Sequence, residues 1–121
     1  MIYKYIGKYI YILYMDDTTE NTHKVIYEQI TQEIQNILVN KQMIKINIED
    51  ININDTIYII YMPYSQRYIY LLHPKYGTVI SIDNNNIIIK NINNETENML
   101  HDNISYFGDS LGYEYIIYKI I

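Results

Sequence analysis

The chain has 121 residues, a net charge of −5 and no cysteine. One domain over residues 1–121 is expected at this length, and the lack of cysteine excludes disulfides, thiolate metal sites and a cysteine nucleophile. The acidic balance disfavours nucleic acid and anionic membranes, because phosphate binding needs a surplus of Lys and Arg. Sixteen tyrosines beside one phenylalanine, four glycines and two prolines are typical of a very AT-rich genome, such as that of a virus, plasmid, organelle or reduced symbiont.

The N-terminal third predicts a strand followed by a helix. Residues 2–14 alternate with period 2 between two faces rich in Tyr and Ile, which predicts a strand where Gly7 marks a bulge or a hairpin bend. After a polar break, apolar side chains recur at helical spacing at Ile26, Ile30, Ile34, Ile37 and Leu38. This stripe predicts an amphipathic helix over about 18–40, with its apolar side on a sheet.

The remaining two thirds of the chain read as short strands separated by turn residues. The predicted strands cover residues 44–48, 56–62, 67–72, 77–82, 86–92 and 113–121. Strands this close in sequence pair antiparallel. Residues 93–111 are polar, with one short helical turn expected near 98–101. The fold class predicted is α+β, a mainly antiparallel sheet of five to seven strands or a small SH3-like barrel, with one helix packed against it.

The strand over 56–62 is apolar on both faces, which a half-solvated sheet does not need. Either the helix or a partner must therefore cover the second face. The N-terminal stretch Met1–Met15 is interrupted by Lys4 and Lys8 and is too short to span a bilayer. It also has no small-residue cleavage site. We therefore expect a cytoplasmic protein without a membrane partner, in the cell of its source or of a host.

The tetrapeptide Tyr14–Asp17 resembles the metal-binding motif of reverse transcriptases, in which adjacent aspartates hold Mg²⁺ for nucleotidyl transfer. That resemblance makes Asp16 and Asp17 candidate metal ligands. Such enzymes also need a third carboxylate on an earlier strand, and only thirteen residues precede Tyr14. We favour the alternative, in which the two acids end a strand and begin a helix, where its dipole stabilises them.

Two further motifs resemble enzyme sites. The block Gly108–Leu111 resembles the nucleophile block of an esterase and lipase family, in which Ser110 would attack and a histidine would serve as base. The pair His101–Asp102 resembles the ligands of metal-dependent phosphohydrolases, but the three histidines show no short-range ligand spacing. Turn and surface residues are the favoured interpretation of both, and no cofactor is predicted.

Tyrosines gather around two cations between the strands at 56–62 and 77–82. The predicted binding surface consists of Tyr64, Arg67, Tyr68, Tyr70, Lys75 and Tyr76. Tyr and Arg are enriched where proteins bind proteins, and aromatics beside cations also stack nucleic-acid bases. The simplest alternative is that AT-rich coding supplies Tyr as the common aromatic and that these side chains fill the core and pair across strands.

These observations favour a small interaction or accessory protein of an AT-rich replicon that binds a protein partner or itself through a Tyr-rich surface. The alternative is a single-stranded nucleic-acid-binding module, which the net charge disfavours. A metal-dependent or serine hydrolase is the third hypothesis, and it depends on the isolated motifs above.

Overall fold

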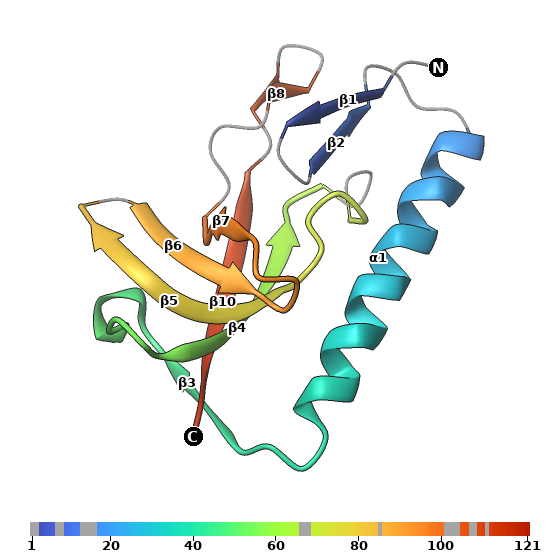
Figure 1. Cartoon of the computed structure of the whole chain (residues 1–121). Coiled ribbons are helices and arrows are strands. Elements are labelled where there is room, and N and C mark those ends of the chain that lie inside the picture. Colours follow the sequence, from blue (N-terminus) through green and yellow to red (C-terminus); the bar gives the residue numbers. More distant parts are fainter. Residues whose placement is uncertain are drawn as a thin grey trace.

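The computed structural model describes residues 3–6, 9–12, 17–65, 69–84, 86–100, 105–106, 109–110 and 112–121. One long helix, a 3-10 turn and short strands follow one another along these residues (Figure 1). In chain order they are β1 (Tyr3–Ile6), β2 (Tyr9–Ile12), α1 (Asp17–Leu38), β3 (Met43–Ile46), η1 (Ile48–Asp50), β4 (Thr56–Pro63), β5 (Lys75–Asp83), β6 (Asn86–Asn91), β7 (Thr96–Asn98), β8 (Ser105–Tyr106), β9 (Asp109–Ser110) and β10 (Tyr113–Ile120).

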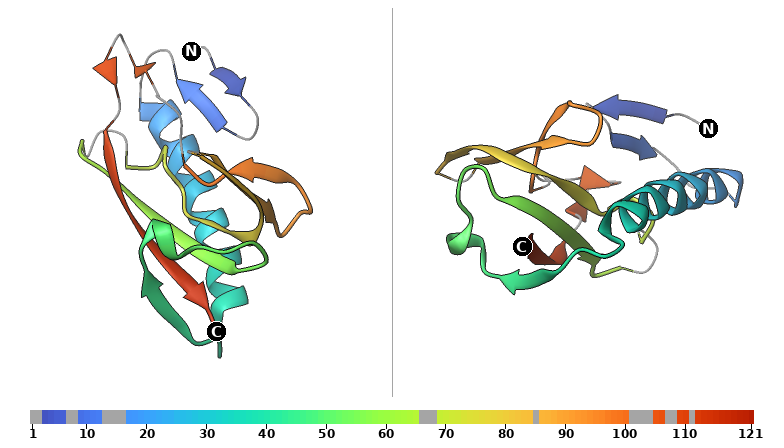
Figure 2. Two further views of the ribbon diagram at one scale, coloured as in Figure 1. Left: turned by 90° about the vertical axis from the view of Figure 1, so that its left-hand side faces the viewer. Right: turned by 60° about the horizontal axis from the view of Figure 1, so that its bottom comes forward.

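Six of these strands form one antiparallel sheet in the order β3-β10-β4-β5-β6-β7. The last strand, β10, lies between β3 and β4, and it pairs with β4 from Tyr113 opposite Pro63 to Lys119 opposite Ile57 (Figure 2). The order runs from one edge to the other without closure, so the fold is an α+β structure with an open sheet. The predicted fold class is confirmed in its sheet form, and the alternative of a small barrel is not adopted.

The helix α1 forms where the apolar spacing predicted it. Ile34 and Leu38 are 4% and 7% exposed and pack against Tyr58 of β4. The helix ends because Asn40 adopts a left-handed conformation with φ of 65°, and the Lys41 N–H donates to the Leu38 carbonyl at 3.0 Å. Asparagine tolerates that conformation and is therefore a common helix terminator.

Two apolar layers lie on opposite faces of β4. One layer, the main core, contains Ile57, Ile59 and Tyr61 of β4, with side chains from β5, β6, β10 and the loops. The other, the helix-side layer, joins Tyr58 to Ile34 and Leu38, with Ile30, Ile60, Tyr76, Tyr118 and Ile120 partly buried around them. The helix therefore covers the second face of β4, which answers the question raised by its two apolar faces.

Tyrosines fill much of this interior and pair across strands. Tyr58 stacks on its register partner Tyr118 with ring centroids 6.0 Å apart, and Tyr61 meets Tyr113 edge-on at 5.7 Å. Tyr61 also donates a hydrogen bond to the Met99 carbonyl. Among the tyrosines whose side chains the structure describes, Tyr64 alone is exposed. Of the nine tyrosines whose side chains are described, Tyr58 and Tyr61 are buried and six more are partly buried, so most of them pack against the fold.

Several predicted boundaries change in the structure. The strand predicted over 67–72 is wrong for residues 69–72, which form a turn that buries Leu72 in the main core. Within the alternating stretch, residues 3–6 and 9–12 form two strands paired from Tyr3 opposite Ile12 to Ile6 opposite Tyr9, which agrees with the hairpin alternative predicted at Gly7, although Gly7 itself lies outside the described residues. In place of the helical turn expected near 98–101, residues 96–98 form β7, because they pair with β6. A helix long and apolar enough to cross a membrane does not occur among the described residues.

Candidate functional site

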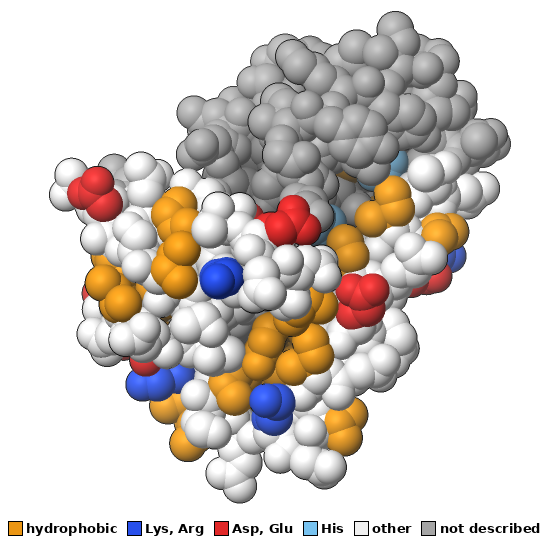
Figure 3. All heavy atoms as spheres, in the orientation of Figure 1, with side chains coloured by type: hydrophobic (Ala, Val, Ile, Leu, Met, Phe, Trp, Pro, Cys, Tyr) orange, Lys and Arg blue, Asp and Glu red, His pale blue; other side chains and the backbone are white. Residues whose placement is uncertain are grey.

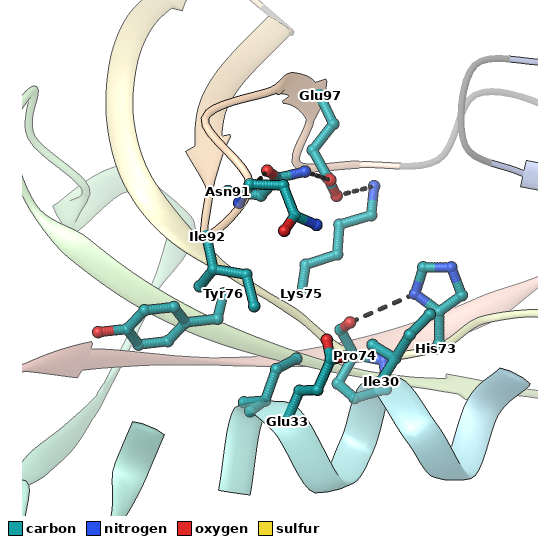
Figure 4. Close-up of a pocket in the computed structure, with 11 residues that line it drawn as sticks. Ile30, Glu33, His73, Pro74, Lys75, Tyr76, Asn91, Ile92 and Glu97 are labelled. Carbon is teal, nitrogen blue, oxygen red and sulfur yellow. Dashed lines mark hydrogen bonds and ion pairs between the residues drawn. The ribbon is translucent and has the colours of Figure 1, made fainter. Parts of the chain in front are cut away.

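A cavity of about 160 Å³ opens between the middle of α1, the beginning of β5 and the turn that joins β6 to β7 (Figure 4). We call it the α1 cavity. Its apolar wall is formed by Ile30, Ile34, Pro74, Tyr76 and Ile92. Its polar wall is formed by Glu33, His73, Lys75, Asn91, Asn93 and Glu97. The cavity therefore belongs to the helix-side layer, and its apolar wall lies beside a polar wall that can form hydrogen bonds.

A buried ion pair forms the polar end of the cavity. Lys75 Nζ lies 3.6 Å from Glu97 Oε1, and the two side chains are 1% and 14% exposed. The ammonium also donates to the Asn98 carbonyl at 2.5 Å and lies 5.7 Å from the centre of the Tyr61 ring. A buried lysine needs this set of partners because an isolated ammonium in the interior is strongly disfavoured.

Asn91 links the ion pair to the turn between β6 and β7. Its Nδ2 donates to Glu97 Oε2 at 2.8 Å, which fixes the carboxylate beside Lys75. Its Oδ1 accepts from the backbone N–H groups of Asn93 and Glu95 at 2.9 and 3.1 Å. Asn94 has a φ of 60°, which allows the chain to reverse there. The Asn-rich turn therefore positions the acidic member of the pair.

Two histidines border this region, and of these His23 is buried and His73 is partly buried. Burial lowers the pKa of His73 below its ordinary value of 6.5, and the charge of Lys75 lowers it further, although the Pro74 carbonyl at 3.4 Å from Nδ1 opposes this shift. Burial also lowers the pKa of His23, which is 5% exposed on α1, and the charge of His73 adds to this lowering. Both imidazoles are therefore neutral at pH 7.

The chemistry of the α1 cavity suits binding. Lys75 and Glu97 neutralise each other, and Asn91 restrains the carboxylate through a hydrogen bond. Within the described ranges, His, Asp and Glu do not form a group of three that could hold a metal ion. What the cavity offers a ligand is an apolar wall beside a fixed pattern of donors and acceptors, which is typical of binding pockets.

The described residues of the predicted binding surface lie in different surroundings. Tyr64 is 70% exposed just after β4, where its N–H donates to the Gly112 carbonyl. Tyr70 contacts Tyr27 of α1 edge-on at 5.5 Å. Lys75 and Tyr76 line the α1 cavity, with the Lys75 ammonium almost inaccessible. Arg67 and Tyr68 lie outside the described residues.

The residues of the enzyme-like motifs are only partly described. Asp16 and His101 lie outside the described residues, and Asp17 is the first residue of α1. Ser110 follows Asp109 in the short strand β9, for which the structure describes the backbone. His73 borders the α1 cavity. The metal and hydrolase hypotheses therefore stay untested.

Sequence reasoning missed Glu97, Asn91 and Ile92, which complete the α1 cavity. They belong to a polar, Asn-rich stretch that is typical of turns, and Glu97 lies 22 positions after Lys75 in the sequence. One feature of the sequence could have indicated an acidic partner. A lone Lys at the start of an apolar strand needs a carboxylate nearby if it is buried. Comparison of the chain with protein-family models, curated proteins and solved structures found no match.

Proposed function

We propose that this chain is a small interaction or accessory protein of an AT-rich replicon, and that it binds a protein partner without chemical conversion. In this proposal one apolar side chain of the partner enters the α1 cavity. The observation that carries the proposal is the cavity itself, about 160 Å³ with an apolar wall. Engineered apolar cavities of about 150 Å³ bind benzene, so the space suits one aromatic or branched aliphatic side chain.

Exposed apolar side chains at the cavity support a macromolecular partner. Ile92 is 44% exposed in the turn between β6 and β7, and Tyr76 is half-buried beside it. Figure 3 shows hydrophobic side chains gathering on this face between the helix and the sheet. An exposed apolar rim around a pocket is the arrangement in which a partner's anchoring side chain binds most strongly.

The charges favour a protein over a nucleic acid as this partner. The net charge is −5, and Lys75, one of the two cations in the predicted surface, is engaged by Glu97 and Asn98. Glu33 adds a further carboxylate at the cavity. Because nucleic-acid binding depends on Lys and Arg that neutralise phosphates, the α1 cavity is a poor site for a nucleotide chain.

The proposal is tested by a tagged pull-down from the native source, with and without nuclease, using the wild type and two variants. Ile92→Asp places a charge at the cavity, whereas Ile53→Asp makes the same change at a side chain that is 53% exposed in the loop before β4. We expect a stoichiometric protein partner that survives nuclease, is lost with I92D and is kept with I53D. A partner that vanishes with nuclease, or one that both variants retain, would contradict the proposal.

A further inference from the structure

The polar wall of the α1 cavity carries more negative than positive charge. Its lining contains two carboxylates, those of Glu33 and Glu97, and one ammonium, that of Lys75. Glu33 comes from α1 and Glu97 from β7, on opposite sides of the cavity (Figure 4). The other basic side chain of the lining, His73, is neutral at pH 7 because burial lowers its pKa. Two carboxylates and one ammonium therefore leave one negative charge at the cavity.

The ammonium of Lys75 is held by groups of the protein itself. Its Nζ lies 3.6 Å from Glu97 Oε1 and donates to the Asn98 carbonyl at 2.5 Å. The side chain of Lys75 is 1% exposed, so a ligand in the cavity hardly reaches it. Asn91 donates to the same carboxylate at 2.8 Å. A ligand therefore meets Lys75 and Glu97 as a pair whose charges cancel.

Glu33 supplies the negative charge that a ligand meets. It is exposed on α1, and it lies in the sequence between Ile30 and Ile34 of the apolar wall. Among the residues that the structure describes, no hydrogen bond or ion pair engages its carboxylate. The cavity thus combines an apolar wall with an accessible carboxylate at its rim.

The elements around the cavity carry the same sign of charge. The β6–β7 turn and β7 contribute Glu95 and Glu97. The lysine of β6, Lys90, precedes Asn91 but is not part of the cavity lining. The helix α1 contains one lysine and four acids, which are Asp17, Glu20, Glu28 and Glu33. Charges of one sign around a cleft attract ligands of the opposite sign, so this cavity favours a cation over an anion.

We propose that the partner binds the α1 cavity with a basic segment, in which a Lys or Arg beside the apolar anchor pairs with Glu33. This inference rests on the function proposed above, because it names the chemistry of the partner at the same cavity. The anchor contacts the apolar wall, and the cation stays at the rim where Glu33 is exposed, so neither charge of this pair is buried. An apolar centre with a polar rim is common in protein interfaces, and the rim charges select the partner.

Three small molecules that share one apolar body test this preference for a cation. The neutral probe is 4-ethylphenol, tyramine adds an ammonium to its ethyl group, and 3-(4-hydroxyphenyl)propionate adds a carboxylate there. NMR titration of the methyl groups of Ile30 and Ile92 gives the dissociation constant of each probe. Glu33→Gln removes the carboxylate at the cavity. Glu28→Gln, the matched control, removes an exposed carboxylate of α1 that does not line the cavity.

We expect tyramine to bind about fourfold more tightly than 4-ethylphenol, which is the size of effect that an exposed ion pair gives, and the propionate to bind more weakly than both. Tyramine should lose this advantage with E33Q and keep it with E28Q. Equal binding of the three probes, or an advantage that E33Q retains, would overturn this inference while the proposed function stands. Methyl groups that respond to none of the three probes would contradict both the inference and the proposed function.

Discussion

The two apolar layers on either side of β4 are closed to very different degrees. In the main core, Ile57, Ile59 and Ile89 are completely inaccessible. In the helix-side layer, Ile30 and Tyr76 are only partly buried, and they line the α1 cavity. Strands and loops enclose the first layer, whereas a single helix covers the second. The closed layer supplies stability, and the incomplete layer leaves room for a ligand.

Alanine substitution in each layer should give the largest effect and tests the difference in packing most clearly. Ile59→Ala should lower the free energy of unfolding by about 4 kcal/mol, because it leaves a void where the structure cannot collapse. Ile30→Ala should lower it by only about 1 kcal/mol, because that side chain already borders a cavity. Urea denaturation of both variants measures the difference, and equal losses would show that the two layers are packed alike.

The buried ion pair gives the next largest effect. Glu97→Ala should lower the free energy of unfolding by about 3 kcal/mol, because it leaves the Lys75 ammonium buried without its carboxylate. The double variant Lys75→Met with Glu97→Leu removes both charges and should regain most of that loss. Glu49→Ala, at an exposed carboxylate, serves as the control and should change stability by less than about 0.5 kcal/mol. A double variant no more stable than E97A would contradict this account.

Protonation of the two histidines should have the smallest effect on stability. The direction of this effect follows from their pKa shifts. Both His23 and His73 have folded-state pKa values below 6.5, so the unfolded chain binds more protons as the pH falls below 6.5. The contribution of the neutral histidines to the free energy of unfolding should be fully present above pH 6.5. It should decrease as the pH falls toward the lowered pKa values. Melting temperatures at pH 7.5 and 5.5 measure this loss. His73→Gln should reduce the difference, and an unchanged difference would remove His73 from the explanation.

Local patterns in the sequence predicted local structure well. The spacing of Ile34 and Leu38 predicted α1 and its buried side, and the two apolar faces of β4 predicted that either the helix or a partner covers the second face. The sheet order could not be predicted, because β10 enters between β3 and β4 from the far end of the sequence. The alternation of apolar and polar residues in a strand does not indicate which distant strand it pairs with.

The candidate site was less predictable than the fold. Tyr76 and Lys75 were expected at a surface because they lie among tyrosines and turn residues. In the folded chain, the turn after β6 brings Glu97 to Lys75, and the pair becomes part of a cavity wall. Asn91 holds that turn through its side chain. These contacts depend on the tertiary structure, so composition and spacing alone do not reveal them.

The most direct test of the binding role of the α1 cavity is an NMR titration of isoleucine methyl groups with 4-methylphenol, which mimics a tyrosine side chain. The account predicts saturable shifts for Ile30, Ile34 and Ile92, small shifts for Ile57 and Ile59 in the main core, and loss of the shifts with I92D. Methyl groups that do not respond, or equal responses in both layers, would contradict the claim that the incomplete layer is the binding site.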